Sequence, residues 1–259
     1  MASNQTTPTL IREALRQQLE ADRRFGIRSI PVGPLHARPD SCAGHQPVGM
    51  PRAPRTANTA ENAARLRVLD DTQVKGCRKC GLCETRTQTV FGQGHAGARL
   101  VFVGEAPGYE EDKQGLAFVG PAGQLLTRMI VAMGLSRDEV FICNVLKCRP
   151  PNNRDPLADE ILSCSPYLRE QLAILQPEML IALGAPAAKT LLNTAQAIGK
   201  LRGRFHEYFL SGVTGMGPSI PLMPTYHPAY LLRNPADKRL AWADLQEVMK
   251  KVGRPSAKD

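Results

Sequence analysis

The sequence predicts an α/β fold, a single three-layer domain in which helices flank a central four-stranded parallel sheet. Four short apolar segments are typical of strands buried on both faces: residues 100–103, 140–145, 179–183 and 220–224. Longer segments with helical periodicity separate these strands, as a parallel sheet requires. Polar residues follow three of the strands directly, which is typical of active sites in this fold class.

Helices are predicted from the spacing of apolar residues. The predicted helices cover residues 61–75, 122–133, 156–175, 185–192 and 235–252. In the second of them, Leu125, Met129 and Ile130 recur every three or four positions and mark the face that packs on the sheet.

The first 60 residues differ from the rest and are predicted to extend a domain formed by residues 61–259. Residues 9–25 carry an arginine-rich helical pattern, whereas residues 31–54 contain six prolines and no apolar periodicity. Such a segment buries too little apolar surface to offset its ordering entropy, so we expect a mobile N-terminal arm. The arm is either a tether for DNA or a partner protein or, as we favour, a dispensable extension.

Composition narrows the class of protein. The chain of 259 residues has a net charge of +9, which favours a polyanionic partner. No stretch approaches the roughly 20 apolar residues of a membrane helix. The N-terminus lacks the basic flank and apolar run of a secretory signal. We therefore expect a soluble cytoplasmic protein with no membrane partner.

Three polar residues stand at the ends of predicted strands. Glu105 follows the first strand in the segment 104–108, Asn144 ends the second, and His227 follows the fourth. Because the carboxyl ends of parallel strands meet at one edge of a sheet, we expect these side chains to lie together. A carboxylate repels phosphate, so Glu105 suits catalysis or the positioning of water. The amide of Asn144 suits reading the edge of a base.

Four of the seven cysteines have a spacing that suits a metal site. Cys77 and Cys80 form a C-x-x-C pair, and Cys148 and Cys164 lie far downstream. The spacing is compatible with a redox-active dithiol, a structural zinc ion, a [4Fe–4S] cluster or ordinary buried thiols. It does not separate zinc from iron–sulfur. Cys143 lies within an apolar strand and is expected to be a core thiol.

The ordered set of motifs resembles the family-4 uracil-DNA glycosylases, the iron–sulfur class of their superfamily, from about residue 75 to residue 250. The motifs are GEAPG at 104–108, FVGPAG at 118–123, CNVLKCRPPNNR at 143–154 and HPAYLLR at 227–233. The resemblance implies a monofunctional DNA-repair enzyme that flips uracil out of DNA, hydrolyses its N-glycosidic bond and leaves an abasic site. It also implies a [4Fe–4S] cluster on Cys77, Cys80, Cys148 and Cys164.

The resemblance assigns roles within the pocket. Glu105 and His227 would be catalytic, with His227 stabilising charge on the base and Glu105 acting on water and the sugar cation. The uracil-binding residues would be Gly104, Gly108, Glu111, Phe118 and Asn144. Phe118 would stack on the base, and Asn144 would pair with uracil O4 and N3–H. Gly108 stands where other families use a tyrosine, and Glu111 resembles the family residue proposed to exclude thymine.

Further residues would contact DNA by resemblance. Leu231, Leu232 and Arg233 would enter the duplex and contact phosphate, although the leucines could instead pack on the core. Lys200, Arg202 and Arg204 could add phosphate contacts, although such loop charges are usually just solvated. Tyr109 departs from the glutamate common at its position, which affects the local contacts of its loop.

The expected partner is uracil-containing DNA, single- or double-stranded, bound by a monomer. Two other functions remain open: a non-catalytic iron–sulfur DNA-binding protein, and an iron–sulfur electron carrier. Neither needs Glu105, Asn144 and His227 together, so these residues favour the glycosylase.

Overall fold

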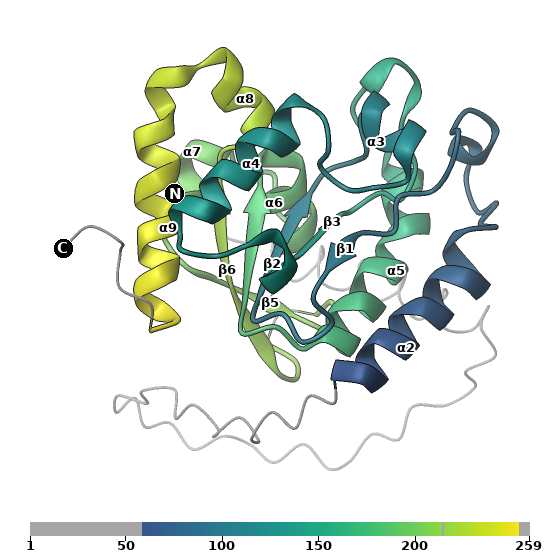
Figure 1. Cartoon of the computed structure of the whole chain (residues 1–259), viewed down its shortest axis with the longest axis horizontal. Helices are drawn as coiled ribbons and strands as arrows, with labels where there is room; N and C mark the ends of the chain where they lie inside the picture. Colours follow the sequence, from purple (N-terminus) through teal and green to yellow (C-terminus); the bar gives the residue numbers. More distant parts are fainter. Residues whose placement is uncertain (1–58, 214, 254–259) are drawn as a thin grey trace, which may run out of the picture. The chain divides into compact units, whose positions relative to one another are not determined.

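The computed structural model describes residues 59–213 and 215–253, which form a six-stranded sheet with helices on both faces (Figure 1). The strand order is β1-β3-β2-β4-β6-β5. The mobile arm and the helical pattern predicted in residues 9–25 lie outside the described residues. None of the described helices is long and apolar enough to span a membrane.

The four strands predicted from the sequence lie side by side at the centre of the sheet and are parallel. They are β3 (Phe141–Asn144), β2 (Leu100–Gly104), β4 (Met179–Leu183) and β6 (Ser219–Thr225). Every residue of β2, β3 and β4 is buried, because helices cover both faces of the sheet. The carboxyl ends of all four strands therefore meet at one edge.

The sheet has two strands more than the sequence predicts. The edge strands β1 (Gln93–Gly94) and β5 (His206–Phe209) pair antiparallel with β3 and β6. Both are short and partly exposed, and they carry polar residues. They lack the apolar run that identifies a buried strand, so the prediction of four strands was incomplete.

The long helices match the predicted segments, and short helices occupy the loops. The long ones are α2 (Thr59–Leu69), α4 (Pro121–Ala132), α5 (Ala158–Leu175), α6 (Ala185–Leu192) and α9 (Lys238–Lys251). The short ones are α3 (Tyr109–Gln114), α7 (Ile198–Leu201) and α8 (Pro228–Arg233). A π-helical turn at Asp70–Val74 extends α2, and 3-10 turns cover Gly81–Glu84, Arg137–Glu139, Pro151–Asn153 and Pro235–Asp237.

Alternate residues of the central strands supply two core layers. Val101 and Val103 of β2 belong to the layer formed with α2, α5 and α6. Leu100 and Phe102 belong to the opposite layer, formed with α4 and α9. Figure 1 shows α2 and α5 on one side of the sheet and α4 and α9 on the other. This sandwich confirms an α/β architecture and leaves the loops after the parallel strands free to form a site.

Candidate active site

A cavity of about 690 Å³ lies at the carboxyl edge of the parallel strands. Each central strand contributes to its wall: Glu105 follows β2, Asn144 ends β3, Gly184 follows β4 and His227 follows β6. The structure therefore brings together Glu105, Asn144 and His227, as expected from the ends of parallel strands. We call this the edge cavity.

Asn144 carries an unpaired polar atom into the edge cavity. Its side chain is buried, and its Oδ1 has no hydrogen-bond partner among the described residues. A buried acceptor left unpaired costs about 1–3 kcal/mol, so such an atom is expected to find its partner in a ligand. Gly104 is the register partner of Asn144, and a side chain on Gly104 would overlap Oδ1 and the Phe118 ring.

Phe118 is held in an unusual conformation at the cavity wall. Its φ is +54°, in the left-handed region that non-glycine residues rarely adopt, and its ring centroid lies 5.7 Å from that of His227. The backbone N–H groups of Val119 and Gly120 donate to Glu111 Oε1 at 2.8 and 2.9 Å. The buried carboxylate of Glu111 therefore fixes the loop that presents Phe118.

Gly108 makes room for Glu111. A Cβ atom on Gly108 would lie 2.7 Å from Glu111 Oε2, closer than real Cβ atoms approach. Both residues line the edge cavity. The position of the Glu111 carboxylate therefore requires a residue without a side chain at position 108.

His227 is a neutral hydrogen-bond donor. The backbone N–H of Ala229 donates to His227 Nδ1 at 3.1 Å, so the proton of the neutral ring is on Nε2. Burial, with a smaller contribution from the charge of Arg233, lowers the pKa of His227 to about 4. The ring is uncharged at neutral pH and offers Nε2–H to a ligand.

Glu105 is a proton acceptor, whereas His227 is a hydrogen-bond donor. Burial raises the pKa of Glu105 to about 7, and the negative charge of Asp155 adds to this effect. Asp155 lines the same cavity, on the loop before α5. A carboxylate with this pKa can accept a proton near neutral pH.

Four residues with no predicted role also line the cavity: Arg154, Asp155, Tyr226 and Tyr230. Arg154 forms a salt bridge with Glu160 of α5 and donates to the Asp155 carbonyl at 3.0 Å. These bonds hold the loop against the helix. The rings of Tyr226 and Tyr230 stack at 4.9 Å. Arg154 and Tyr230 lie within the motifs at 143–154 and 227–233, and Asp155 and Tyr226 are adjacent to them, so position in the motifs was the available signal.

Leu231, Leu232 and Arg233, which follow His227 in α8, differ in their exposure. Leu231 is 1% exposed and packs in the core with Leu125 and Ala241, which is the alternative that the sequence left open for the leucines. The turn of α8 directs Leu231 inward. Leu232 is 40% exposed, and Arg233 lines the edge cavity. The contact of these residues with DNA stays a prediction.

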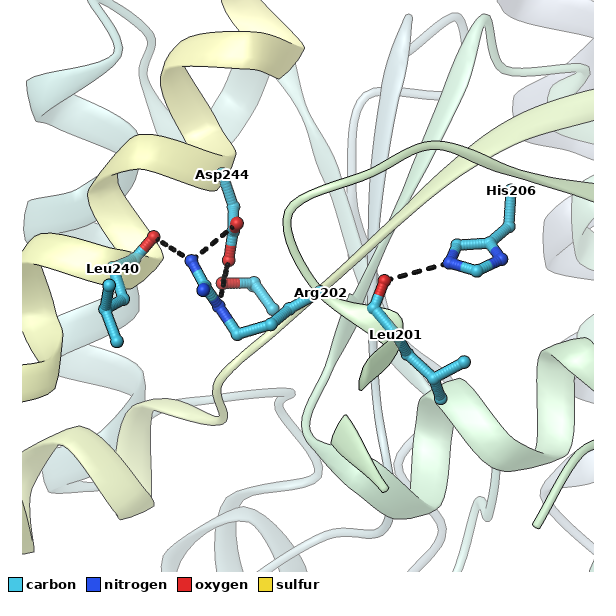
Figure 2. A network of polar contacts seen from close by, with 6 residues as sticks. Leu201, Arg202, His206, Leu240 and Asp244 are labelled. Carbon is cyan, nitrogen blue, oxygen red and sulfur yellow. Dashed lines mark hydrogen bonds and ion pairs between the residues drawn. The ribbon is translucent and has the colours of Figure 1, made fainter. Parts of the chain in front are cut away.

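Arg202 forms a largely buried ion pair within the domain. Its Nη2 donates to Asp244 Oδ1 at 2.8 Å and to the Leu240 carbonyl at 2.6 Å (Figure 2). The Thr225 hydroxyl donates to Asp244 Oδ2 at 2.6 Å. Since Thr225 ends β6 two residues before His227, this network ties the strand end to α9.

Comparison with known proteins identifies the family. The uracil DNA glycosylase superfamily matches residues 91–246, and type-4 uracil-DNA glycosylases match over most of the domain. The chain belongs to the type-4 uracil-DNA glycosylase family. It is 45% identical over 181 residues to the protein of Saccharolobus solfataricus, covering 68% of this chain and 82% of that one.

Two further type-4 uracil-DNA glycosylases show similar agreement. The Archaeoglobus fulgidus protein is 40% identical over 192 residues, covering 72% of this chain and 94% of its own. The Thermotoga maritima protein is 42% identical over 178 residues, covering 68% and 88%.

The type-4 glycosylase domain has a second, smaller cavity that all four predicted cysteine ligands line: Cys77, Cys80, Cys148 and Cys164. Hydrogen-bond donors surround their sulfur atoms. The backbone N–H of Lys147 lies 3.2 Å from Cys164 Sγ, Arg86 Nη1 lies 3.1 Å from Cys148 Sγ, and the Tyr167 hydroxyl lies 3.2 Å from Cys77 Sγ. Cys143 is buried in β3, as expected of a core thiol.

The donor set fits a group that carries negative charge and needs thiolate ligands. Burial raises the pKa of Cys148 to about 11, whereas the guanidinium of Arg86 opposes this shift. A metal bound here would displace such protons, and the surrounding N–H and O–H groups would donate to thiolate sulfur. Within residues 59–213 and 215–253, no three His, Cys, Asp or Glu side chains converge to hold one metal ion.

Lys147 connects the cysteine cavity to the edge cavity of the glycosylase. Its side chain is 1% exposed, and Nζ donates to the Asn144 carbonyl at 2.8 Å and to Gln171 Oε1 at 2.6 Å. Gln171 in turn donates to the Phe91 carbonyl at 2.9 Å. The buried amino group of Lys147, whose pKa is lowered by burial, therefore holds the end of β3 next to two of the cysteines.

Proposed function

We propose that the protein removes uracil from DNA by flipping the base into the edge cavity and hydrolysing its N-glycosidic bond. The single observation that carries this function is the buried, unpaired Oδ1 of Asn144 in a cavity that also holds Glu105 and His227. The type-4 uracil-DNA glycosylases that resemble the chain support the same activity. The product is an abasic site in DNA, an intermediate of base excision repair.

Asn144 recognises the edge of the base by hydrogen bonding. Uracil presents a donor at N3–H beside an acceptor at O4, so Asn144 Oδ1 accepts from N3–H and Nδ2 donates to O4. Cytosine presents the reverse pattern at these positions. It would leave the buried amide unpaired and is rejected by the resulting loss of hydrogen bonds.

His227 stabilises the leaving group. Cleavage of the bond from N1 to the sugar leaves negative charge on uracil, shared with O2. The Nε2–H of neutral His227 donates to this oxygen and needs no proton transfer. A donor preorganised for developing charge acts as an oxyanion hole does.

Glu105 acts on the sugar side. Ionised Glu105 stabilises the cationic sugar through space and orients a water molecule toward C1′. The water oxygen forms the new bond to C1′, and its proton passes to the carboxylate. None of the described residues that line the edge cavity is a lysine, which favours hydrolysis over an imine mechanism and so a monofunctional enzyme.

Phe118 and Glu111 shape the pocket. We expect the Phe118 ring to stack on the flipped base, opposite the side from which water attacks. Glu111 fixes residues 118–120, so the wall cannot yield to the additional methyl group of thymine. This assigns the exclusion of thymine to rigidity of the loop that Glu111 holds.

The four cysteines that line the smaller cavity would hold a [4Fe–4S] cluster. A bound cluster would supply iron–thiolate bonds that cross-link the segment around Cys77 to the loop after β3 and to α5. Four thiolates could equally hold a structural zinc ion. Visible absorbance and iron content of the purified protein distinguish the two metals, and Cys148→Ala should lose both signals.

A strand-cleavage assay tests the function. The substrate is a single-uracil oligonucleotide, single- or double-stranded, with thymine and cytosine at the same position as matched controls. Cleavage only after alkali, and only with uracil, is the expected result. Absence of release from protein loaded with iron would favour the non-catalytic DNA-binding alternative.

Asn144→Asp tests the reading of the base. The carboxylate keeps the acceptor but loses the donor to O4, so uracil release should fall by about 100-fold or more. Release of cytosine relative to uracil should rise. An unchanged ratio would contradict the role of Asn144.

A further inference from the structure

Two cationic side chains contact the ring of an exposed tyrosine beside the edge cavity. Tyr109 is 49% exposed and follows Gly108, which lines the cavity. Lys113 Nζ lies 4.4 Å from the centre of its ring, and Arg149 Cζ lies 5.1 Å from it. Arg149 precedes Pro150, another residue of the cavity wall. Two positive charges therefore meet on one aromatic ring at the border of the cavity.

Neither cation has a carboxylate partner within the part of the chain that the structure describes. Lys113 and Arg149 form no ion pair there, although the Tyr109 side chain and, more weakly, the charge of Glu110 raise the pKa of Lys113. Arg149 Nε instead donates to Asn153 Oδ1 at 2.7 Å. The cations are thus positioned by a ring and an amide, which restrict them without neutralising their charge.

This arrangement is suited to an anion. Like charges repel, and a cation–π contact at an exposed site contributes only about 0.5–1 kcal/mol, so an anion bound between the two cations is favoured. The guanidinium of arginine matches two phosphate oxygens, and a lysine ammonium adds a point charge. Preorganisation by Tyr109 reduces the side-chain entropy lost on binding.

We propose that Tyr109, Lys113 and Arg149 form a phosphate-binding site for the DNA strand next to the flipped nucleotide. The proposal rests on the proposed function, since it takes the edge cavity as the place of the uracil. Gly108 and Pro150, the chain neighbours of Tyr109 and Arg149, line that cavity, so a phosphate flanking the flipped nucleotide can reach the cations. We refer to these three residues as the Tyr109 site.

Salt dependence of DNA binding tests the Tyr109 site. The probe is a single-stranded or duplex oligonucleotide with one 2′-fluoro-2′-deoxyuridine, which resists hydrolysis, bound to the full-length protein. For duplex DNA, log K falls with log salt with a slope of about −0.9 per phosphate contact. The double variant Lys113→Gln/Arg149→Gln removes the contact to this phosphate, so it should reduce the slope by about 1 and weaken binding several-fold at low salt.

Substitutions of the ring separate positioning from charge. Tyr109→Phe keeps the aromatic face and should retain the slope. Tyr109→Glu places a carboxylate between the cations and should weaken binding at least as much as the double variant Lys113→Gln/Arg149→Gln. The side chains of Tyr109 and Lys113 are exposed, so we expect unfolding temperatures to remain close to that of the unmodified protein.

Lys251 provides the matched control. Its Nζ lies 4.2 Å from the centre of the Phe205 ring, so it is also a cation held over an aromatic residue. It lies in the last turn of α9, and Figure 1 shows this end of α9 far from α3, at the other end of the domain. Lys251→Gln should change neither the slope nor the affinity.

The outcomes separate this proposal from the proposed function. An unchanged slope in Lys113→Gln/Arg149→Gln, with uracil release intact, would overturn the Tyr109 site alone. An equal change in slope in Lys251→Gln would also overturn it, because the effect would then be one of overall charge. Failure of the unmodified protein to release uracil from any substrate would instead contradict the proposed function.

Discussion

Gly104 and Asn144 are register partners on the adjacent parallel strands β2 and β3, and the space that a Gly104 side chain would fill is the space beside Asn144 Oδ1. The space beside Oδ1 stays open because Gly104 has no side chain. A base with a donor at N3 can then supply its partner. The shape of the pocket and its hydrogen bonding therefore depend on the same pair of residues.

Gly104→Ala should obstruct the pocket without preventing folding. The added methyl group overlaps Asn144 Oδ1 and the Phe118 ring, and such overpacking costs about 1–3 kcal/mol. Displacement of these groups by about 1 Å should lower kcat/KM for uracil release by about 100-fold. Gly199→Ala is the control, because a Cβ atom there meets nothing within 4 Å. Equal activity of both variants would contradict this account.

Uracil release should increase with pH around neutrality. Burial raises the pKa of Glu105 to about 7, so the carboxylate is mostly protonated below that pH and mostly ionised above it. If the ionised form is active, kcat should rise as pH passes through about 7 and then level off. Single-turnover rates across this range provide the measurement. Glu105→Gln should lower the rate and abolish the rise.

Asp155→Asn should move this rise to lower pH. The charge of Asp155 is the second cause of the raised pKa of Glu105, and its removal makes ionisation easier. Burial remains, so the pKa should stay above the ordinary value for glutamate. A pH profile that does not move would show that the Asp155 charge does not act on Glu105 during catalysis.

His227→Ala should slow the chemical step more than it weakens DNA binding. Loss of one preorganised donor typically lowers kcat by about 100- to 1000-fold. Binding of DNA that contains 2′-fluoro-2′-deoxyuridine should change far less. Because burial lowers the pKa of His227 to about 4, its ring should not titrate near pH 6.5. The shape of the pH profile around that pH should therefore be the same in the unmodified enzyme and in His227→Ala. A loss of affinity alone would exclude the role of His227 as a donor to O2.

Asp244→Ala should destabilise the domain strongly. It leaves Arg202, which is largely buried, without its carboxylate, and breaking such a pair typically costs about 3–5 kcal/mol in the free energy of unfolding. Urea denaturation measures this change. Glu247→Ala is the control on the same helix, because Glu247 pairs with Lys250 at an exposed site worth less than about 1 kcal/mol. Equal effects would contradict the bracing of β6 by α9.

Lys147→Met should loosen the end of β3. The substitution removes donors to the Asn144 carbonyl and to Gln171 Oε1, and each unpaired buried acceptor costs about 1–3 kcal/mol. Uracil release should fall together with stability, since the same bond holds Asn144 in register. Exposed Lys189 offers a control in Lys189→Met, which should alter neither.

Much of the fold could be predicted because buried parallel strands need continuous apolar runs. Leu100–Gly104 and Met179–Leu183 are such runs, and each was recognised from its residues. Edge strands such as Gln93–Gly94 are short and partly exposed, so no local pattern marks them. The convergence of Glu105, Asn144 and His227 was also predictable, because the topology of a parallel sheet brings strand ends to one edge.

The sequence by itself thus determined the parallel sheet, the residues at its carboxyl edge and the four cysteines. The tertiary structure alone decided how those residues are paired and buried. It placed Leu231 in the core and Leu232 on the surface, and it paired Arg202 with Asp244, which lies 42 positions away. It also set the proton of His227 on Nε2 and raised the pKa of Glu105. Hydrogen bonding, burial and pKa depend on which atoms surround a group in space, and residues distant in the chain supply those atoms.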